Sequence, residues 1–388
     1  MKISFDNTEI AFSGKSDSDL TRAYLLFKMV SSNQLVKVGR ALTNFSIKLN
    51  LPIKSLIKAT IFKQFCGGET IEECDPTITS LAKYNIKTIL DYSIEGNKSE
   101  VEFEKTAAEV VATLEKTKTS KNLPFSVFKM TGIARFDLLE KVNSKLTLTD
   151  IEKEEWERVI QRMDFICKTA YDLGESVLVD AEESWIQDAI DELVLEMMRK
   201  YNNKKAIVYN TLQMYRTGRI AYLEELLELA KKEDFFIGVK VVRGAYMEKE
   251  RKRAIDLDYA SPIHVDKLSS DNDYDQVLLY CIENLDKVAI CAGTHNESST
   301  LYLTELMNKF EIRSNHPHVY FAQLLGMSDH ISYNLAKAGY NVAKYVPYGP
   351  VKEILPYLIR RAEENTSVAG QTSRELNLIL LERKRRRI

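Results

Sequence analysis

The sequence has 388 residues, of which 45% are hydrophobic and 28% charged, a composition typical of globular proteins and unlike that of disordered or fibrous chains. This length is large for one compact core, so we expect either a large α/β barrel or two domains. The formal net charge of −2 argues against a protein that binds nucleic acid through its overall charge.

The first part of the chain is predicted to be helical. Apolar residues recur at helical spacing from about Asp17 to Tyr84, in the segments DLTRAYLLFKMV, QLVKVGRALTNFSIKLN and IKSLIKATIFKQF. The pair Gly67 and Gly68 is a typical helix stop. We therefore expect an N-terminal helical region, residues 1–84, that packs on the rest of the protein.

Eight short apolar stretches follow, separated by segments with helical spacing. They cover residues 87–95, 125–133, 176–183, 206–215, 237–246, 288–296, 319–327 and 341–349. Strands that alternate with helices predict an all-parallel sheet, and eight is the number that closes a (β/α)₈ barrel. We expect an α/β fold, a (β/α)₈ TIM-type barrel over residues 85–370 with an N-terminal helical extension. An open doubly wound sheet is the alternative, but no G-x-G-x-x-G or Walker A pattern follows any of the stretches.

The last segment, residues 371–388, is predicted to form a basic C-terminal helix or tail. It combines an apolar stripe with a basic cluster in RELNLILLERKRRRI. This pattern is compatible with contact to an anionic membrane surface. The density of charge favours the other interpretation, a frayed and solvated tail.

The cysteines and the first residues predict a cytoplasmic protein. The five cysteines form no CxxC or other metal-binding spacing, and an odd number in a long chain indicates reduced, buried thiols. The first residues show no pattern of a secretory or transit signal. No apolar run approaches the roughly 20 residues that span a bilayer.

Polar residues collect at the C-terminal ends of the predicted strands. These ends carry Asp91 with Glu95, Lys129, Asp180 with Glu182 and Glu183, Asn210 with Gln213, Lys240 with Arg243, Thr294 to Asn296, Gln323, and Tyr345 with Tyr348. In (β/α)₈ barrels the active site lies at this end of the strands. The pattern therefore predicts a polar site at one end of the barrel.

One helical segment has more positive charge than its neighbourhood balances. The stretch LPYLIRRAEEN, residues 355–365, carries the adjacent Arg360 and Arg361 next to an apolar face. Glu364 can pair with either arginine but cannot neutralise both. The stretch by itself fits an exposed helix edge with an ordinary ion pair, or a cationic site for an anionic ligand.

Several motifs resemble those of the FAD-dependent proline dehydrogenase family, in its monofunctional type. The motifs are VKVVRGAYMEKERKRA, VDAEES, AGTHN, LLGMSD and YVPYGPVKEILPYLIRRAEEN, and the resemblance runs from about Asp91 to Asn365. It implies a barrel that holds FAD at the strand ends. The implied reaction oxidises L-proline to Δ¹-pyrroline-5-carboxylate by hydride transfer from proline C5 to flavin N5, the first step of proline catabolism. Electrons would pass to a quinone, with peripheral contact at the inner face of a membrane.

The resemblance assigns residues to the substrate. Lys129, Arg360 and Arg361 would clamp the carboxylate of proline through charge-assisted hydrogen bonds. Glu95 would pair with one arginine when the site closes, and Asp180 would lie near the site. The residues that would pack against the proline ring are Tyr246, Leu324 and Tyr345.

The resemblance also assigns residues to the cofactor. Lys240 would lie near flavin N5 and stabilise the anionic reduced flavin. Either Asn210 or Gln213 would contact the isoalloxazine edge, and the motif leaves that choice open. The remaining FAD-lining positions are Val242, Gly244, Ala245, Thr294, His295, Asn296 and Glu364.

Three competing functions are weaker. A 4-hydroxyproline dehydrogenase on the same scaffold should have a smaller residue where Tyr345 stands. A metal-dependent barrel hydrolase or an aldolase should have marked metal ligands or a Schiff-base lysine, and the H-x-H of His316 and His318 precedes a strand, opposite the expected site. A non-catalytic sensor of proline or FAD should lack the cationic clamp.

Overall fold

The computed structural model describes residues 3–30, 57–93, 99–367 and 371–388, without the side chains of residues 30, 359, 361–367 and 371–373. The predicted helix QLVKVGRALTNFSIKLN lies outside the described residues. Contacts divide the chain into two compact units, unit 1 with Met1–Ile94 and Gln323–Ile388, and unit 2 with Glu95–Ala322. The predicted division at residues 84 and 370 stays a prediction.

The strands form a closed parallel barrel in the order in which they occur in the chain. They are β1 (Ile86–Tyr92), β2 (Phe125–Lys129), β3 (Ser176–Asp180), β4 (Val208–Gln213), β5 (Ile237–Val242), β6 (Val288–Gly293), β7 (Val319–Leu324) and β8 (Val342–Tyr348). The predicted (β/α)₈ barrel is therefore confirmed, and each of the eight predicted strands is present.

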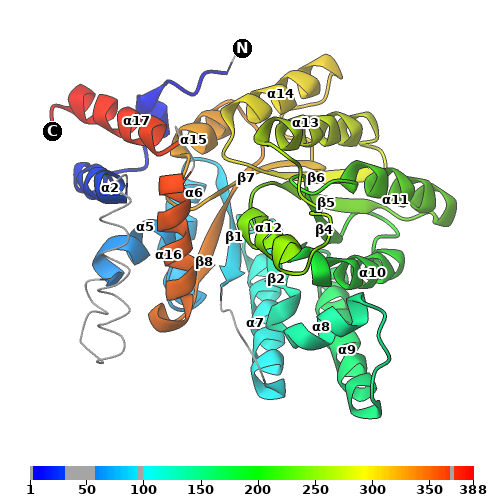
Figure 1. The fold of residues 1–388 in the computed structure, drawn as a ribbon. Coiled ribbons are helices and arrows are strands. Elements are labelled where there is room, and N and C mark those ends of the chain that lie inside the picture. The colour runs from blue at the N-terminus through cyan, green and yellow to red at the C-terminus, as the bar shows by residue number, and fades with distance from the viewer. Residues whose placement is uncertain (1–2, 31–56, 94–98, 368–370) are drawn as a thin grey trace. The chain divides into compact units, whose positions relative to one another are not determined.

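Unit 2 contains the long helices that accompany strands β2 to β6, drawn from cyan to yellow in Figure 1. They are α7 (Glu100–Thr119), α8 (Phe136–Asn143), α9 (Asp150–Leu173), α10 (Ser184–Tyr201), α11 (Arg219–Glu233), α12 (Met247–Asp256), α13 (Lys267–Glu283) and α14 (Glu297–Lys309), with the short η3 (Met130–Gly132). Their ends follow local sequence signals. Ser99 with Glu102 forms a capping box before α7, and Gly174 ends α9 in the left-handed conformation with φ 72°.

The strand register in unit 2 separates two faces of the sheet. The Tyr209 ring packs edge-on to Phe125 at 5.3 Å between centroids, and a Cβ added to Gly238 would lie 2.5 Å from Tyr209 Cγ. Because side chains alternate along a strand, Thr211 and Gln213 share the face of Tyr209. Lys240 shares that face through its register with Thr211. This is the interior face of the barrel strands.

Unit 1 combines the chain segments before Ile94 with those after Gln323. Its elements besides β1 and β8 are α1 (Thr8–Ala11), α2 (Asp17–Val30), η1 (Lys58–Phe62), α5 (Lys63–Phe65), η2 (Glu72–Cys74), α6 (Asp75–Ala82), α15 (Asp329–Lys337), α16 (Val351–Ser367) and α17 (Gln371–Arg386). β1 and β8 pair in parallel, with Ile89 opposite Tyr345. One apolar cluster joins α2, α16 and α17 and includes Phe27, Leu358 and Leu378.

The expectation of a frayed, solvated C-terminus is wrong. Residues Gln371–Arg386 form helix α17, which packs beside α2 (Figure 1), and its Leu378 and Ile379 are buried in the apolar cluster of unit 1. Arg386 donates hydrogen bonds to the carbonyl oxygens of Lys15 and Phe12, each at 2.8 Å. Tertiary packing thus orders a segment whose charge density alone suggested disorder.

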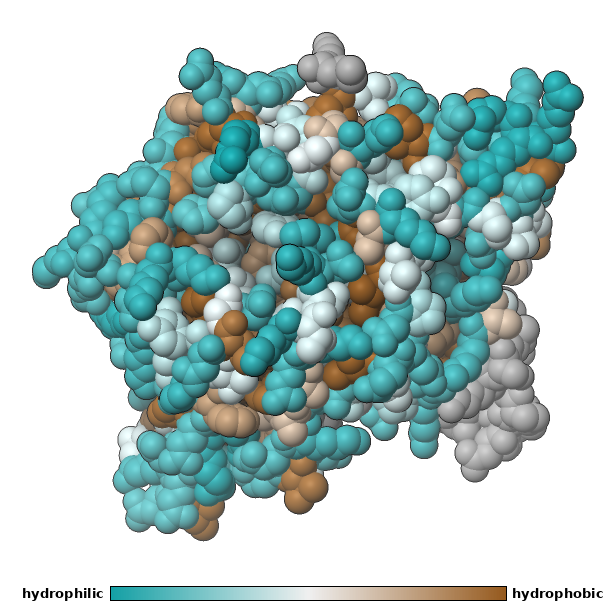
Figure 2. All heavy atoms as spheres, turned by 180° about the vertical axis from the view of Figure 1, so that it is seen from behind, coloured by the Kyte–Doolittle hydropathy of each residue, from teal (hydrophilic) through white to brown (hydrophobic). Residues whose placement is uncertain are grey.

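The described residues contain no helix that is both long and apolar enough to cross a bilayer. Figure 2 shows one face of the molecule, where hydrophilic side chains dominate and apolar ones appear in scattered patches. All five cysteines are buried thiols and none forms a disulfide. The prediction of buried cysteines is confirmed.

Candidate active site

Two lysines and one aspartate meet on the interior face at the ends of three strands of unit 2. Asp180 ends β3 and forms an ion pair through Oδ1 with Nζ of Lys240 in β5. Lys129 ends β2, and its Nζ lies 4.0 Å from Oδ2 of the same carboxylate. Lys240 is buried, whereas the Lys129 side chain keeps 20% of its surface exposed. Within the ion pairs described, two ammonium groups thus share one carboxylate, so this group of three side chains carries a positive surplus.

Glu182, which sequence analysis did not assign to the site, ties the ends of three strands together. Its carboxylate accepts hydrogen bonds from the Thr131 backbone N–H at 2.9 Å and from the Thr131 hydroxyl at 2.6 Å. Its backbone carbonyl accepts one from the Gln213 amide at 2.6 Å. Thr131 follows Lys129 by two residues, so Glu182 helps to fix the strand end that presents this lysine. Its place at the end of a predicted strand and in the VDAEES motif, two residues after Asp180, signalled it.

Burial also changes the protonation of Glu182. Removal from water raises the pKa of its carboxyl to about 7, although the hydrogen bonds from Thr131 and the charge of Lys129 oppose the rise. A carboxyl with this pKa is partly protonated near neutral pH. The positive surplus of Lys129, Asp180 and Lys240 is therefore only partly offset by this neighbour.

The structure distinguishes Asn210 from Gln213. The Asn210 amide donates to Asp191 of α10 at 2.8 Å and to Tyr222 of α11 at 3.3 Å, and its oxygen accepts the Thr211 N–H at 2.8 Å. Asn210 thus faces the surrounding helices, on the opposite side of β4 from Gln213. An isoalloxazine contact by the Asn210 side chain would require this buried network to break. Gln213 faces the interior but is itself bonded, since its amide donates to the Glu182 carbonyl oxygen at 2.6 Å and to the Tyr215 hydroxyl at 2.8 Å. The choice between the two amides stays a prediction.

The segment after β5 turns sharply at Gly244. Its φ of 92° is a conformation that a residue with a side chain rarely adopts, and the position is exposed with open space where a Cβ would stand. Ala245 is also exposed, while Val242 and Tyr246 are half-buried. This turn brings the backbone of RGAY to the surface at the strand end.

Arg243, in the same turn, was noted at a strand end but not assigned to the site. Its guanidinium donates to Asp271 at 2.6 Å, to the Ser299 hydroxyl at 2.8 Å and to the Thr294 hydroxyl at 3.2 Å. It also lies over the Tyr274 ring, 3.9 Å from the centroid. The guanidinium therefore joins the ends of β5 and β6 to the helices α13 and α14.

The residues after β6 lead into the N-terminus of α14. The Asn296 side chain accepts a hydrogen bond from the Ser299 N–H at 3.1 Å, and is thereby the N-cap of the helix. Thr294 is buried, and His295 is half-buried beside it. The Asn296 side chain thus serves the helix, while the first turn of α14 offers backbone N–H groups and a positive dipole end to an anion.

Helix α12 is fixed to the start of α10. Its buried Glu250 accepts hydrogen bonds from the Ser184 N–H and hydroxyl, each at 2.6 Å. Arg253 lies 4.4 Å from the centre of the Trp185 ring. The residue that precedes this helix is Tyr246, so these contacts determine where the predicted proline-ring residue stands.

Unit 1 holds the other predicted substrate residues. Tyr345 of β8 is buried, and Leu324, at the end of β7, is partly buried against the apolar cluster. Arg360 lies in α16 and is half-buried. Glu95 lies outside the described residues, as do the side chains of Arg361 and Glu364. The structure thus leaves those three assignments as predictions.

The H-x-H motif makes contacts that explain it without a metal. A ring nitrogen of His316 accepts the His318 N–H at 3.2 Å, and the His318 ring lies 2.9 Å from the carbonyl oxygen of Leu285. The two rings meet edge-on, 5.2 Å apart. Across the residues described, no group of three or more His, Cys, Asp or Glu side chains is placed to hold a metal ion.

Fold and site together define a (β/α)₈ barrel with a cationic site at the C-terminal ends of its strands. The proline dehydrogenase family model matches residues 74–374. The chain belongs to the proline dehydrogenase family and is an oxidoreductase of that family.

Relatives that match nearly the whole chain support this assignment. The chain is 34% identical over 374 residues to the carbapenem antibiotics biosynthesis protein CarD of Pectobacterium carotovorum, covering 95% of this chain and 96% of that protein. It is 32% identical over 431 residues to mitochondrial proline dehydrogenase 1 of Dictyostelium discoideum, covering 99% of this chain and 75% of the relative. A hydroxyproline dehydrogenase of Xenopus laevis is 29% identical over 412 residues, covering 97% of this chain and 88% of the relative.

Solved structures share the fold. Proline utilization A from Bdellovibrio bacteriovorus, inactivated by N-propargylglycine, superimposes with a TM-score of 0.73 at 21% identity. The match covers 93% of this chain and 38% of that protein, so the present chain spans well under half of the solved one. At this level of identity the likeness concerns the fold alone.

Proposed function

We propose that the protein oxidises L-proline to Δ¹-pyrroline-5-carboxylate with FAD as cofactor and a quinone as electron acceptor, as the first step of proline catabolism. The observation that carries the proposal is the surplus positive charge of Lys129 and Lys240 around the single carboxylate of Asp180. Such a site suits a substrate that presents a carboxylate beside a small apolar ring.

The donor groups of unit 2 fit FAD. Gln213 and Lys240 place an amide and a cation on the interior face, where they suit the polar edge and the N5 region of a flavin. The open turn at Gly244 and the first turn of α14 suit the approach of a phosphate-bearing chain, with Val242, Ala245, Thr294 and His295 alongside. Bound FAD supplies the acceptor for the hydride that leaves C5 of proline.

The protein's own residues bind and orient the substrate. Lys129 holds the proline carboxylate, and we assign Arg360 and Arg361 to the same task. Asp180 fixes both lysines by ion pairing, so we do not assign it as the base; the amine proton is released to water. The charge of Lys240 stabilises negative charge that develops beside it.

The apolar side of the substrate is assigned to aromatic and aliphatic residues. Tyr246, Leu324 and Tyr345 pack against the ring of proline. Glu95 closes over the substrate by pairing with an arginine, and Glu364 orients its neighbouring arginine. These roles rest on the family motifs in which the residues occur.

A hydroxyproline substrate is the second candidate, since one relative is named a hydroxyproline dehydrogenase. Tyr345 is 7% exposed and bulky, so a hydroxyl on the substrate ring would meet a buried aromatic side chain. Bringing that hydroxyl against an apolar surface without a partner costs binding free energy. We therefore favour L-proline over 4-hydroxyproline.

The electron acceptor determines where the protein works. A quinone is dissolved in the membrane, so we propose a cytoplasmic protein that contacts the inner membrane face without spanning it.

The test is the visible absorption spectrum of the purified protein before and after anaerobic addition of L-proline. We expect a flavin spectrum that bleaches with L-proline and changes little with 4-hydroxyproline. A flavin that L-proline leaves oxidised would contradict the substrate assignment. Failure to bind FAD on reconstitution would contradict the cofactor assignment.

A further inference from the structure

Helix α17 has an exposed face that combines apolar and cationic side chains. Leu380, Leu381 and Ile388 are 43%, 56% and 41% exposed, and Lys384 and Arg387 are exposed beside them. Leu380, Leu381 and Lys384 lie on one side of the helix by their spacing, and Arg387 and Ile388 follow its last residue, Arg386. Isolated exposed apolar residues are common, but a stripe interleaved with cations is typical of helices that lie at a membrane surface.

The opposite face of α17 shows that this exposure does not come from loose attachment. Leu378 and Ile379 are each 1% exposed in the apolar cluster of unit 1. Glu382 is fully buried and forms ion pairs with Arg385 and Arg386, at 2.8 and 2.7 Å. The helix is therefore held on one face, while the other stays available.

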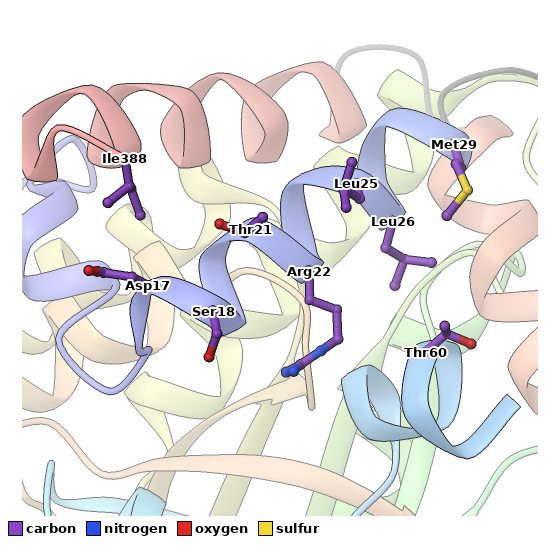
Figure 3. Close-up of a pocket in the computed structure, with 9 residues that line it drawn as sticks. All are labelled: Asp17, Ser18, Thr21, Arg22, Leu25, Leu26, Met29, Thr60 and Ile388. Carbon is purple, nitrogen blue, oxygen red and sulfur yellow. The ribbon is translucent and has the colours of Figure 1, made fainter. Parts of the chain in front are cut away.

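Helix α2 extends the exposed apolar surface. Leu25 and Met29 are 52% and 49% exposed. With Leu26 and the C-terminal Ile388 they line a hollow of about 550 Å³ beside α2. In Figure 3, Leu26 and Met29 point from α2 towards Thr60 of η1, and Ile388 lies near the start of the same helix. We call the exposed side chains of α2 and α17, with this hollow, the α2–α17 surface.

The charge of this surface differs from that of the whole chain. Residues 371–388 contain six basic and two acidic residues, in a chain whose net charge is −2. Part of this charge is offset, since Glu382 pairs with Arg385 and Arg386, and Arg374, Arg385 and Arg386 also pair with Asp6, Glu9 and Asp17. Within the described part of the chain, Lys384 and Arg387 have no ion-pair partner. The surface thus presents these two exposed cations to solvent.

We propose that the α2–α17 surface docks the protein on an anionic lipid membrane. Apolar side chains enter the headgroup boundary, and Lys384 and Arg387 contact the anionic headgroups. A second copy of the chain fits less well, because a two-fold contact would place two basic clusters against each other.

This inference rests on the proposed function, since a quinone acceptor requires approach to a membrane, and it names the surface that makes the approach. The two can be tested separately. Flavin bleaching by L-proline reports the proposed function without a membrane. Vesicle binding reports the docking surface without catalysis.

The experiment measures co-sedimentation of the full chain with vesicles of phosphatidylcholine alone or mixed with phosphatidylglycerol. We expect binding to the mixed vesicles at low salt, little binding to phosphatidylcholine alone, and release by salt. Equal binding to both kinds of vesicle, or to neither, would overturn the proposal.

Charge variants assign the effect to the surface. The double variant K384E and R387E should bind mixed vesicles at least tenfold more weakly, taking about tenfold for each 1.4 kcal/mol and ~1 kcal/mol per basic residue. The control K105E and K118E makes the same change of charge at exposed lysines of α7 and should bind like the wild type. Equal loss in both variants would show a general effect of net charge and overturn the assignment.

Apolar variants test the other half of the surface. L381S with I388S should weaken binding severalfold, whereas V101S with L146S, at two apolar positions exposed elsewhere, should not. Light scattering without vesicles is measured for all variants. A change of molar mass in the α2–α17 variants alone would show that a second copy covers the surface and would overturn the proposal.

Discussion

Each unit of the protein contains an aspartate between two lysines, but the two groups differ in their ion-pair distances and in the burial of their lysines. In unit 1, Asp329 lies 2.9 Å from Lys344 and 3.4 Å from Lys15. Lys344 is fully buried and also donates to the carbonyl oxygen of Met327 at 2.5 Å. In unit 2, Asp180 pairs with Lys240, and Lys129 stays 4.0 Å away and partly exposed.

We interpret the difference as one between a structural ion cluster and the proposed binding site. Burial alone would raise the pKa of Asp329, yet the charges of Lys344 and Lys15 outweigh it and hold the pKa at about 2. In that cluster both lysines are within 3.4 Å of the carboxylate and Lys344 is fully buried, although the Lys15 side chain keeps 22% of its surface exposed. In the cluster around Asp180 the exposure of the second lysine is similar, but Lys129 stays 4.0 Å from the carboxylate at the end of a strand, where we propose that it takes a ligand. The role of a Lys–Asp–Lys group therefore depends on where it lies and on how closely its lysines pair with the carboxylate, more than on its composition.

The largest expected effect is on stability and comes from breaking the cluster around Asp329. Lys344→Met should lower the free energy of unfolding by about 3 to 5 kcal/mol, because the buried Asp329 loses its nearer partner. Urea unfolding measures the change, and Lys337→Met, at an exposed lysine of α15, is the matched control. The KM for L-proline should stay at the wild-type value. Unchanged stability in Lys344→Met would mean that this cluster is no more structural than the one around Asp180.

Removing the partly exposed lysine of unit 2 should affect binding instead of stability. Lys129→Met should reduce kcat/KM for L-proline about 30- to 150-fold, corresponding to the loss of a charged hydrogen bond of about 2 to 3 kcal/mol. The urea midpoint should change little. Lys121→Met, in the loop before β2, is the control. A variant that loses stability but keeps kcat/KM would place Lys129 with the structural cations.

Glu182 should show its effect through pH. Its pKa is raised from 4.5 to about 7, so the native carboxyl keeps a proton that the unfolded chain has already lost within this interval. Ionisation therefore destabilises the native state, and wild-type stability should fall by up to about 3 kcal/mol as pH rises from about 4.5 to 7. Glu182→Gln should lack this loss.

Urea unfolding at pH 5 and pH 8 measures the difference for Glu182→Gln. The control is Glu154→Gln, on the exposed side of α9. The free energies of unfolding of wild type and Glu182→Gln could instead differ by the same amount at both pH values. The carboxyl would then be ionised at both, and it would offset the positive charge of the lysines more fully than its burial indicates.

The sequence predicted the existence and order of the strands because each is an apolar run between helical segments. It extended most of them too far at the C-terminal end. The stretch 237–246 was predicted as strand, whereas β5 ends at Val242. The following residues remain suited to a strand by composition, but the chain leaves the ladder in the turn at Gly244. Site loops and strand ends share residue types, so composition cannot separate them.

The site was predicted in part, and what was missed depends on tertiary contacts. Strands in a parallel barrel are buried on both faces, so the pattern of apolar residues did not show that Asn210 and Gln213 point in opposite directions. The same limit hid Lys344, a lysine in a strand that is fully buried by its partners. The direction and burial of these side chains follow only from the strand registers and from the contacts that the side chains make.

The pairing of β1 with β8 and the hydrogen bonds from Arg386 to residues near the N-terminus have a consequence for folding. Arg386 and Lys15 are separated by 371 positions, and unit 1 draws on segments from both sides of residues 95–322. Such non-local contacts form only after a long loop has closed, and the loss of chain entropy on closure slows folding. Residues 95–322 leave the ribosome before the second half of unit 1, so unit 2 can form first. The apolar side of helix α2 then stays uncovered until α17 has been synthesised.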